Sequence, residues 1–221
     1  KLVCLENTYN GRVVPQDNIE AIAEIARANG LSLHLDGARL MNAVVKSNRS
    51  ASDLVAPFDT VSLCLSKGLG APVGSVLTGP RDFIKTARRA RKLLGAFRFI
   101  LAGLALTLVV HPAPGLAQDV TVSTKSRANQ LAHRLGVLDG FSVNLDTVQP
   151  NMVWLSVPDA GSAGGSESFS DFKRERGLIV ADPSGVDRMV RLVTHLDIAE
   201  EDLSVIFDAF EAWSAQSAKA A

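Results

Sequence analysis

The chain has 221 residues, of which 47% are hydrophobic and 21% are charged. Its 23 Lys and Arg residues balance its 23 Asp and Glu residues, so the sequence carries no overall attraction for nucleic acid or for acidic membranes. Length and composition instead predict one large domain, or one domain and a smaller one, with a substantial core.

The first part of the chain alternates between strand-like and helix-like patterns. Apolar runs predict strands at residues 2–5, 31–35, 60–65 and 75–78. Apolar residues at helical spacing predict helices at residues 17–28, 40–46 and 81–94. The last of these helices carries a basic cluster, which we interpret as a solvated face or a subunit contact. Strands that alternate with helices favour a parallel α/β sheet.

Three features bear on the compartment. Cys4 and Cys64 lie inside predicted buried strands, where unpaired cysteines act as small hydrophobes, as suits a reducing cytoplasm. The chain opens on a strand-like run, so we expect no signal peptide. The longest apolar run, residues 99–110, is too short to span a bilayer and predicts a buried helix.

The second part of the chain begins after a cluster of Pro and Gly at residues 111–115. Helices are predicted at residues 121–135, 169–176 and 200–214, and strands at residues 141–145, 152–157, 178–181 and 189–194. A loop rich in Gly and Ser covers residues 159–166. This order predicts two domains, residues 1–111 and a smaller α+β domain of residues 112–221.

The motif around Lys67 carries the most chemical information. Lys67 follows the apolar run 60–65, and small residues surround it through Ser75. Asp36 ends the earlier run 31–35. Ligands of open α/β sheets lie outside the carboxyl ends of the strands, so these two side chains could share one ligand. Pyridoxal phosphate (PLP) requires such a pair, because an amine binds its aldehyde and a carboxylate keeps its ring nitrogen protonated.

Simpler readings of the same motif compete with this hypothesis. A lysine after a strand is usually a solvated charge. Gly68, Gly70 and Gly74 imitate a dinucleotide-binding fingerprint, but that fingerprint must open a helix, and a strand is predicted here instead. The phosphate loop of nucleotide hydrolases requires Gly-Lys-Ser/Thr, whereas the order here is Ser66-Lys67-Gly68.

Six motifs in family order resemble those of the low-specificity L-threonine aldolases. They occupy residues 5–8, 34–43, 66–75, 88–92, 149–153 and 191–197. The resemblance implies a PLP-dependent enzyme, with no metal, that works as a homodimer or homotetramer. It also implies a fold: part of an aspartate-aminotransferase-like (fold type I) large domain with a mainly parallel α/β sheet, followed by a small α+β domain.

The resemblance assigns roles to matching residues. Lys67 matches the lysine that binds the cofactor covalently, and Asp36 matches the carboxylate that pairs with its ring nitrogen. Arg39 matches an arginine near the phenolic oxygen of the ring. Arg191 matches the arginine whose guanidinium fork binds the substrate carboxylate. For each residue, the competing interpretation is an ordinary ion pair.

The chain departs from the family pattern at several positions. The family usually has a histidine facing the substrate β-hydroxyl where Tyr9 stands, and a phenol is a poorer base at neutral pH. The glycine-rich segment after the basic helix is altered at residues 95–99. No phosphate-binding loop of the family's kind is found, so we interpret the chain as the C-terminal portion of such an enzyme. His34, inside a predicted strand, is interpreted as a core residue. His195 is interpreted as a structural residue at a strand end, with a second interpretation as a catalytic contributor.

The implied reaction is cleavage of L-threonine or L-allo-threonine to glycine and acetaldehyde. The sequence leaves two alternatives open. One is another fold-type-I PLP enzyme, either a β-eliminating lyase or a transaminase. The other is an inactive fragment or pseudoenzyme with an interaction role, suggested by Tyr9 and residues 95–99.

Overall fold

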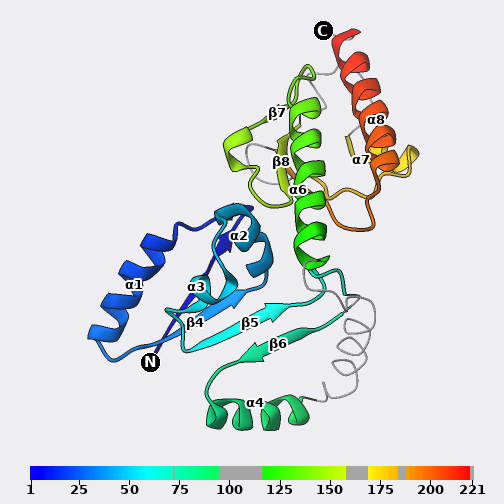
Figure 1. The fold of residues 1–221 in the computed structure, drawn as a ribbon. Helices are drawn as coiled ribbons and strands as arrows, with labels where there is room; N and C mark the ends of the chain where they lie inside the picture. Colours follow the sequence, from blue (N-terminus) through cyan, green and yellow to red (C-terminus); the bar gives the residue numbers. More distant parts are fainter. Residues whose placement is uncertain (72, 95–115, 158–168, 184–187, 220–221) are drawn as a thin grey trace. The chain divides into compact units, whose positions relative to one another are not determined.

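A computed structural model describes residues 1–71, 73–94, 116–157, 169–183 and 188–219. The chain forms two compact units, residues 1–122 and residues 123–221 (Figure 1). The domain boundary expected near residue 112, the helix predicted at 99–110 and the loop predicted at 159–166 lie outside the described residues.

The first unit is built on a four-stranded sheet in the order β1-β4-β5-β6. Its strands are β1 (Leu2–Glu6), β4 (Ser32–Gly37), β5 (Thr60–Cys64) and β6 (Ser75–Thr78). The first three strands in that order are parallel and β6 is antiparallel to β5, which confirms the prediction of a mainly parallel sheet (Figure 1).

Four helices belong to the described part of this unit before residue 95. They are α1 (Gln16–Ala28), α2 (Leu40–Ser47), α3 (Ala51–Val55) and α4 (Arg81–Leu93). Helix α1 packs Ala23 and Ala26 against Leu33 of β4. It ends before Gly30, whose φ of +65° is readily adopted only by glycine. The sequence reading missed α3, which Ser50 begins by accepting a hydrogen bond from the backbone N–H of Asp53.

The sheet face away from α1 is only partly covered by the described elements: Phe83 of α4 lines a cavity there together with His34 and Leu77. Leu33 and Leu35 are buried on the α1 side, and the alternating residues of β4 point to the other face. Cys4 and Cys64 lie on that other face, so Cys4 is exposed and Cys64 is half-buried. Both cysteines are free, as expected, but the prediction that their side chains are buried was wrong.

The second unit contains a three-stranded antiparallel sheet in the order β7-β8-β9. Its strands are β7 (Ser142–Val143), β8 (Met152–Ser156) and β9 (Met189–Val193), and a 3₁₀ turn, η1 (Leu145–Thr147), follows β7. The helices are α6 (Leu116–Leu135), α7 (Phe169–Glu175) and α8 (Glu200–Lys219). Helix α6 starts before the first residue of this unit.

The strand predicted at residues 178–181 is absent. This segment has no regular secondary structure, and the backbone carbonyl of Val180 accepts a hydrogen bond from the Lys173 ammonium. Its apolar side chains line a cavity instead of pairing with a strand. The apolar run was therefore a correct signal of packing and a wrong signal of strand formation.

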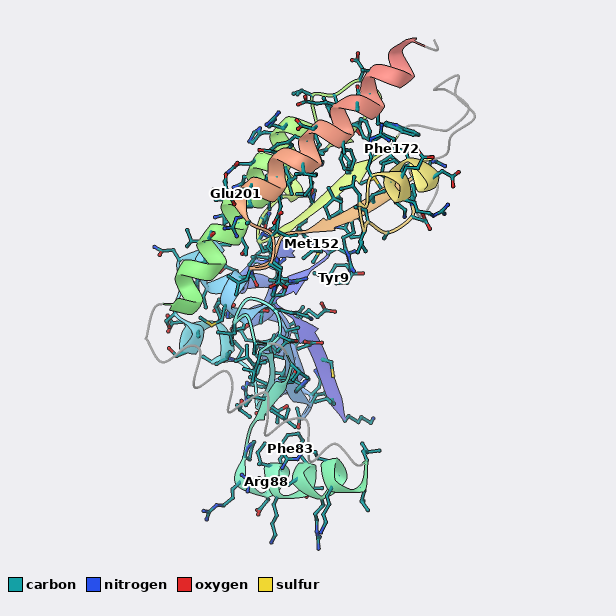
Figure 2. The ribbon with its side chains drawn as sticks, turned by 90° about the vertical axis from the view of Figure 1, so that its right-hand side faces the viewer. Tyr9, Phe83, Arg88, Met152, Phe172 and Glu201 are labelled. Carbon is teal, nitrogen blue, oxygen red and sulfur yellow. The ribbon has the colours of Figure 1, made fainter. Side chains whose placement is uncertain are left out.

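One continuous hydrophobic core holds the second unit together. Phe141, Phe169 and Trp213 belong to it, together with the fully buried Phe172 (Figure 2) and Phe210. The rings of Phe172 and Trp213 lie 4.7 Å apart in an edge-on arrangement, and those of Phe141 and Phe210 lie 5.5 Å apart. Such pairs stabilise a core beyond the apolar area they bury.

Among the described residues, no helix is both long and apolar enough to cross a membrane.

Candidate active site

Asp36 lies near the carboxyl end of β4. It pairs in register with Glu6 of β1 on one side and with Ser62 of β5 on the other. Its side chain is exposed on the sheet face away from α1. The backbone N–H of Ala38 donates a 3.0 Å hydrogen bond to Oδ1 of Asp36, which orients the carboxylate and leaves the second oxygen for a further donor.

Gly37 permits the close approach of two strands beside Asp36. A Cβ atom at this position would lie 2.8 Å from the backbone oxygen of Ser62. That distance is too short for any other residue unless β4 and β5 move apart. Glycine at position 37 is therefore a requirement of the site's backbone.

Lys67 follows the carboxyl end of β5 in a tight loop. The backbone N–H of Leu65 donates to the carbonyl of Gly74, and that of Gly70 donates to the carbonyl of Lys67, both at 2.9 Å. Gly70 has a φ of +69°, which glycine adopts without strain. These bonds close a compact turn in which the Lys67 side chain is half-buried.

Arg39 lies next to the Lys67 loop. It is the residue that precedes α2, and its side chain lines a narrow gap together with Gly68 and Leu69 of that loop. Asn42 of α2 lines the same gap. Within the described residues, neither polar atom of the Asn42 amide has a hydrogen-bond partner, although Asn42 is only 1% exposed.

Tyr9 occupies a small hairpin that follows β1. Strands β2 (Thr8–Tyr9) and β3 (Arg12–Val13) pair across Asn10 and Gly11, whose φ values of 48° and 83° are typical of a two-residue hairpin turn. The sequence Asn-Gly was a signal for this hairpin that the sequence reading missed. Tyr9 is 60% exposed (Figure 2) and follows β1 at the same end of the sheet as Asp36.

Arg191 belongs to the second unit. It lies on β9 opposite Trp154 of β8, and its side chain is exposed. It lines a cavity of about 550 Å³ whose other walls are mainly apolar, including Leu178 and Val180. Lys173, whose side chain is 13% exposed, fixes one wall through hydrogen bonds to the carbonyl of Val180 and to Oδ1 of Asp182.

The two histidines with predicted structural roles have local partners. Nδ1 of His195 lies 3.3 Å from Oδ2 of Asp197. Nδ1 of His34 lies 2.8 Å from Oγ1 of Thr60, and the ring is half-buried on the open face of the sheet. The expectation that His34 is a core residue was therefore wrong, because it points away from α1. The described residues contain no group of three or more His, Cys, Asp or Glu side chains placed to hold a metal ion.

The first unit thus brings four of the five predicted site residues to one end of its sheet. Asp36 lies near the carboxyl end of β4 and Lys67 follows the neighbouring parallel strand β5. Arg39 flanks the lysine loop, and Tyr9 follows β1. Arg191 has its own surroundings in the second unit. An amine and a carboxylate on adjacent strand ends are the donor set that PLP requires. The residues present therefore fit this cofactor.

A family model described as "Beta-eliminating lyase" matches residues 1–158 of the chain. The chain therefore belongs to the beta-eliminating lyase family. It is also 35% identical over 217 residues to a probable low-specificity L-threonine aldolase 2 of Arabidopsis thaliana. That alignment covers 96% of this chain but only 59% of the relative, so the chain spans less than two thirds of the relative's length.

Solved structures agree on the fold. A threonine aldolase of Leishmania major superposes with a TM-score of 0.73 at 19% identity, covering 98% of this chain and 61% of that one. A PLP-bound C–S lyase of Staphylococcus hominis superposes with a TM-score of 0.62 at 17% identity, covering 97% and 55%. The chain has the fold of the type I PLP-dependent enzymes, represented in part.

Proposed function

We propose that this protein is a PLP-dependent threonine aldolase that cleaves L-threonine or L-allo-threonine to glycine and acetaldehyde. The observation that carries the proposal is the placement of Asp36 near the carboxyl end of β4 and of Lys67 just after the neighbouring parallel strand β5, with Arg39 beside the lysine loop. Similarity to the Arabidopsis threonine aldolase supports the choice of reaction.

When bound, PLP supplies an electron sink for the negative charge that develops at the substrate α-carbon. Lys67 would hold the cofactor through its side-chain nitrogen. Asp36 would keep the ring nitrogen protonated through a charge-assisted hydrogen bond. The bond from the Ala38 N–H orients this carboxylate before the cofactor arrives.

The remaining residues act on the substrate. Arg191 binds the substrate carboxylate with its guanidinium fork and so orients the Cα–Cβ bond, which is a contribution of position. Tyr9 hydrogen-bonds the β-hydroxyl, and a water molecule takes the proton of that hydroxyl as the Cα–Cβ bond breaks and acetaldehyde forms. Solvent water then returns one proton to the α-carbon, which completes glycine.

A β-eliminating lyase is the second candidate. The family model that matches residues 1–158 carries that description, and Tyr9 stands where threonine aldolases usually have a histidine. Such an enzyme would release ammonia and an α-keto acid.

We further propose that the protein is cytoplasmic and acts on small β-hydroxy-α-amino acids. We also propose that it is a homodimer or homotetramer, and light scattering on the purified protein would measure its oligomeric state.

The experiment that tests the proposal uses the protein expressed from its full reading frame. We expect purified protein to bind PLP with a visible absorbance and to convert threonine to equimolar glycine and acetaldehyde. Lys67→Ala should abolish both, while Lys46→Ala, on α2, should preserve both. Visible absorbance that persists in Lys67→Ala, or ammonia as the product, would contradict the aldolase assignment.

A further inference from the structure

Near their carboxyl ends, β1 and β4 place two carboxylates side by side. Glu6 pairs in register with Asp36 on the neighbouring parallel strand, and the backbones of such strands lie about 4.8 Å apart. Residues paired in this way point to the same face of a sheet, and both side chains are exposed on the face away from α1. The strand ends therefore carry a second negative charge beside the one assigned to the cofactor.

Neither carboxylate is neutralised by a basic side chain in the described part of the chain. Glu6 forms no hydrogen bond or ion pair there, and Asp36 accepts only the bond from the Ala38 N–H. Ser62, the neighbour of Asp36 on β5, donates its hydroxyl to the Leu35 carbonyl instead. Like charges on directly paired residues of a sheet are destabilising, so the stability of the sheet does not explain this pair.

The surroundings of the pair indicate which cation it accepts. Lys67 follows β5, and β5 and β1 lie on opposite sides of β4, so the three strand ends carry Glu6, Asp36 and an amine in that order. Two carboxylates supply few of the ligands of Ca²⁺, which takes about six to eight oxygens. A protonated ring nitrogen requires only one hydrogen-bond acceptor, and further negative charge nearby stabilises it.

We propose that Glu6 is a positioning residue for the cofactor: beside Asp36, its carboxylate favours binding of PLP with a protonated ring nitrogen. Asp36 accepts the hydrogen bond from that nitrogen, and Glu6 adds a second negative charge without touching the ring. The positive charge of the bound ring in turn offsets the repulsion between the two carboxylates. This role rests on the proposed function, because it requires that PLP bind with its ring nitrogen at Asp36.

The test compares PLP with an analogue in which a carbon atom replaces the ring nitrogen, so that the ring cannot carry the charge. Glu6→Gln keeps the size of the side chain and removes its charge. It should weaken PLP binding about threefold, because interactions between partly solvated charges are modest, and it should leave the affinity for the analogue unchanged. Both affinities are measured by titration calorimetry on the protein expressed from its full reading frame.

Two further variants serve as controls. Glu6→Asp retains the charge and should retain the wild-type ratio of the two affinities. Glu24→Gln removes an exposed carboxylate from α1, which packs on the opposite face of the sheet, and should also leave that ratio unchanged. The difference between Glu6→Gln and the wild type should shrink at high salt, because salt screens exposed charges.

The outcomes separate the two proposals. An equal affinity loss for PLP and the analogue in Glu6→Gln shows an ordinary structural role and overturns the charge role. Wild-type affinities for both compounds in Glu6→Gln overturn it as well, and neither result touches the proposed function. Wild-type protein that fails to bind PLP through Lys67 overturns the proposed function, and the role of Glu6 with it.

Discussion

The two units differ in how their hydrophobic residues are packed. The second unit has one continuous core with six buried aromatic residues, and its buried Asn151 and Thr194 are hydrogen-bonded to each other's backbone. Among the described residues, the first unit has small aliphatic clusters, an only partly covered sheet face, and buried Asn7, Gln16 and Asn42 amides without hydrogen-bond partners. Four of the five candidate site residues lie in the first unit, which has the smaller hydrophobic clusters. The unit that contains most of the candidate site is therefore not the unit with the larger hydrophobic core, and we expect the two units to differ in local stability.

The largest effect is expected from breaking the core of the second unit. Phe210 is fully buried, and its ring lies 5.5 Å from Phe141 and 5.9 Å from Phe169. Phe210→Ala should lower the free energy of unfolding by about 3–5 kcal/mol, because it leaves a cavity among aromatic rings. Hydrogen exchange should show the loss of protection concentrated in β8 and β9.

A matched control is Phe83→Ala in the first unit, since Phe83 is 42% exposed on α4 and should tolerate truncation with a small change. Equal loss of protection in β4 and β5 of the Phe210→Ala protein would contradict the contrast, because it would mean that both units unfold together.

A smaller effect is expected from separating two strands of the first unit. Gly37→Ala places a Cβ 2.8 Å from the Ser62 carbonyl oxygen, and the backbone must move to relieve the contact. We expect a loss of about 1–3 kcal/mol in the free energy of unfolding, measured in urea, because overpacking strains the pair of strands. PLP binding should weaken as well, since Asp36 precedes the displaced residue.

Gly30→Ala tests whether that effect is specific to the site. Gly30 has a positive φ and open space around it, so the variant should cost about 1 kcal/mol through backbone strain alone. It should leave PLP binding unchanged. Weaker binding in Gly30→Ala would show that general destabilisation, not strand separation, controls the site.

The smallest effect is expected on the surface of the second unit. Arg134 lies 2.8 Å from Glu211 and stacks 3.9 Å from the centroid of the Phe207 ring, but its side chain is half-exposed. Arg134→Gln should lower the free energy of unfolding by less than about 1 kcal/mol, because solvent screens such pairs. The loss should shrink at high salt. A large, salt-independent loss would place Arg134 in the core rather than on its rim.

Much of the fold was predictable because the signals were local. The helix at Gln16–Ala28 and the strand at Ser75–Thr78 follow from the spacing of their apolar residues. The segment 178–181 was predicted wrongly, since an apolar run does not reveal whether it meets a strand or a cavity. Cys4 was predicted to be buried because a strand pattern does not show which face is only partly covered.

The candidate site was also predicted only in part from the sequence. The rule that ligands meet strand ends correctly placed Asp36 and Lys67 at one end of the sheet. Glu6 and Gly37 were missed as site residues, although both lie within matched motifs. Their importance depends on neighbours across the sheet, Asp36 and the Ser62 carbonyl, which no local pattern records.

The sheet face away from α1 carries two native thiols, and one of them lies close to the Lys67 loop. Cys4 is exposed on β1, and Cys64 lies three residues before Lys67. The rates at which an alkylating reagent modifies Cys4 and Cys64 would therefore report the accessibility of an exposed and a half-buried position on this face, without any engineered label. Occupancy of the lysine loop should slow modification of the second thiol more than that of the first, which makes the unaltered protein its own reporter.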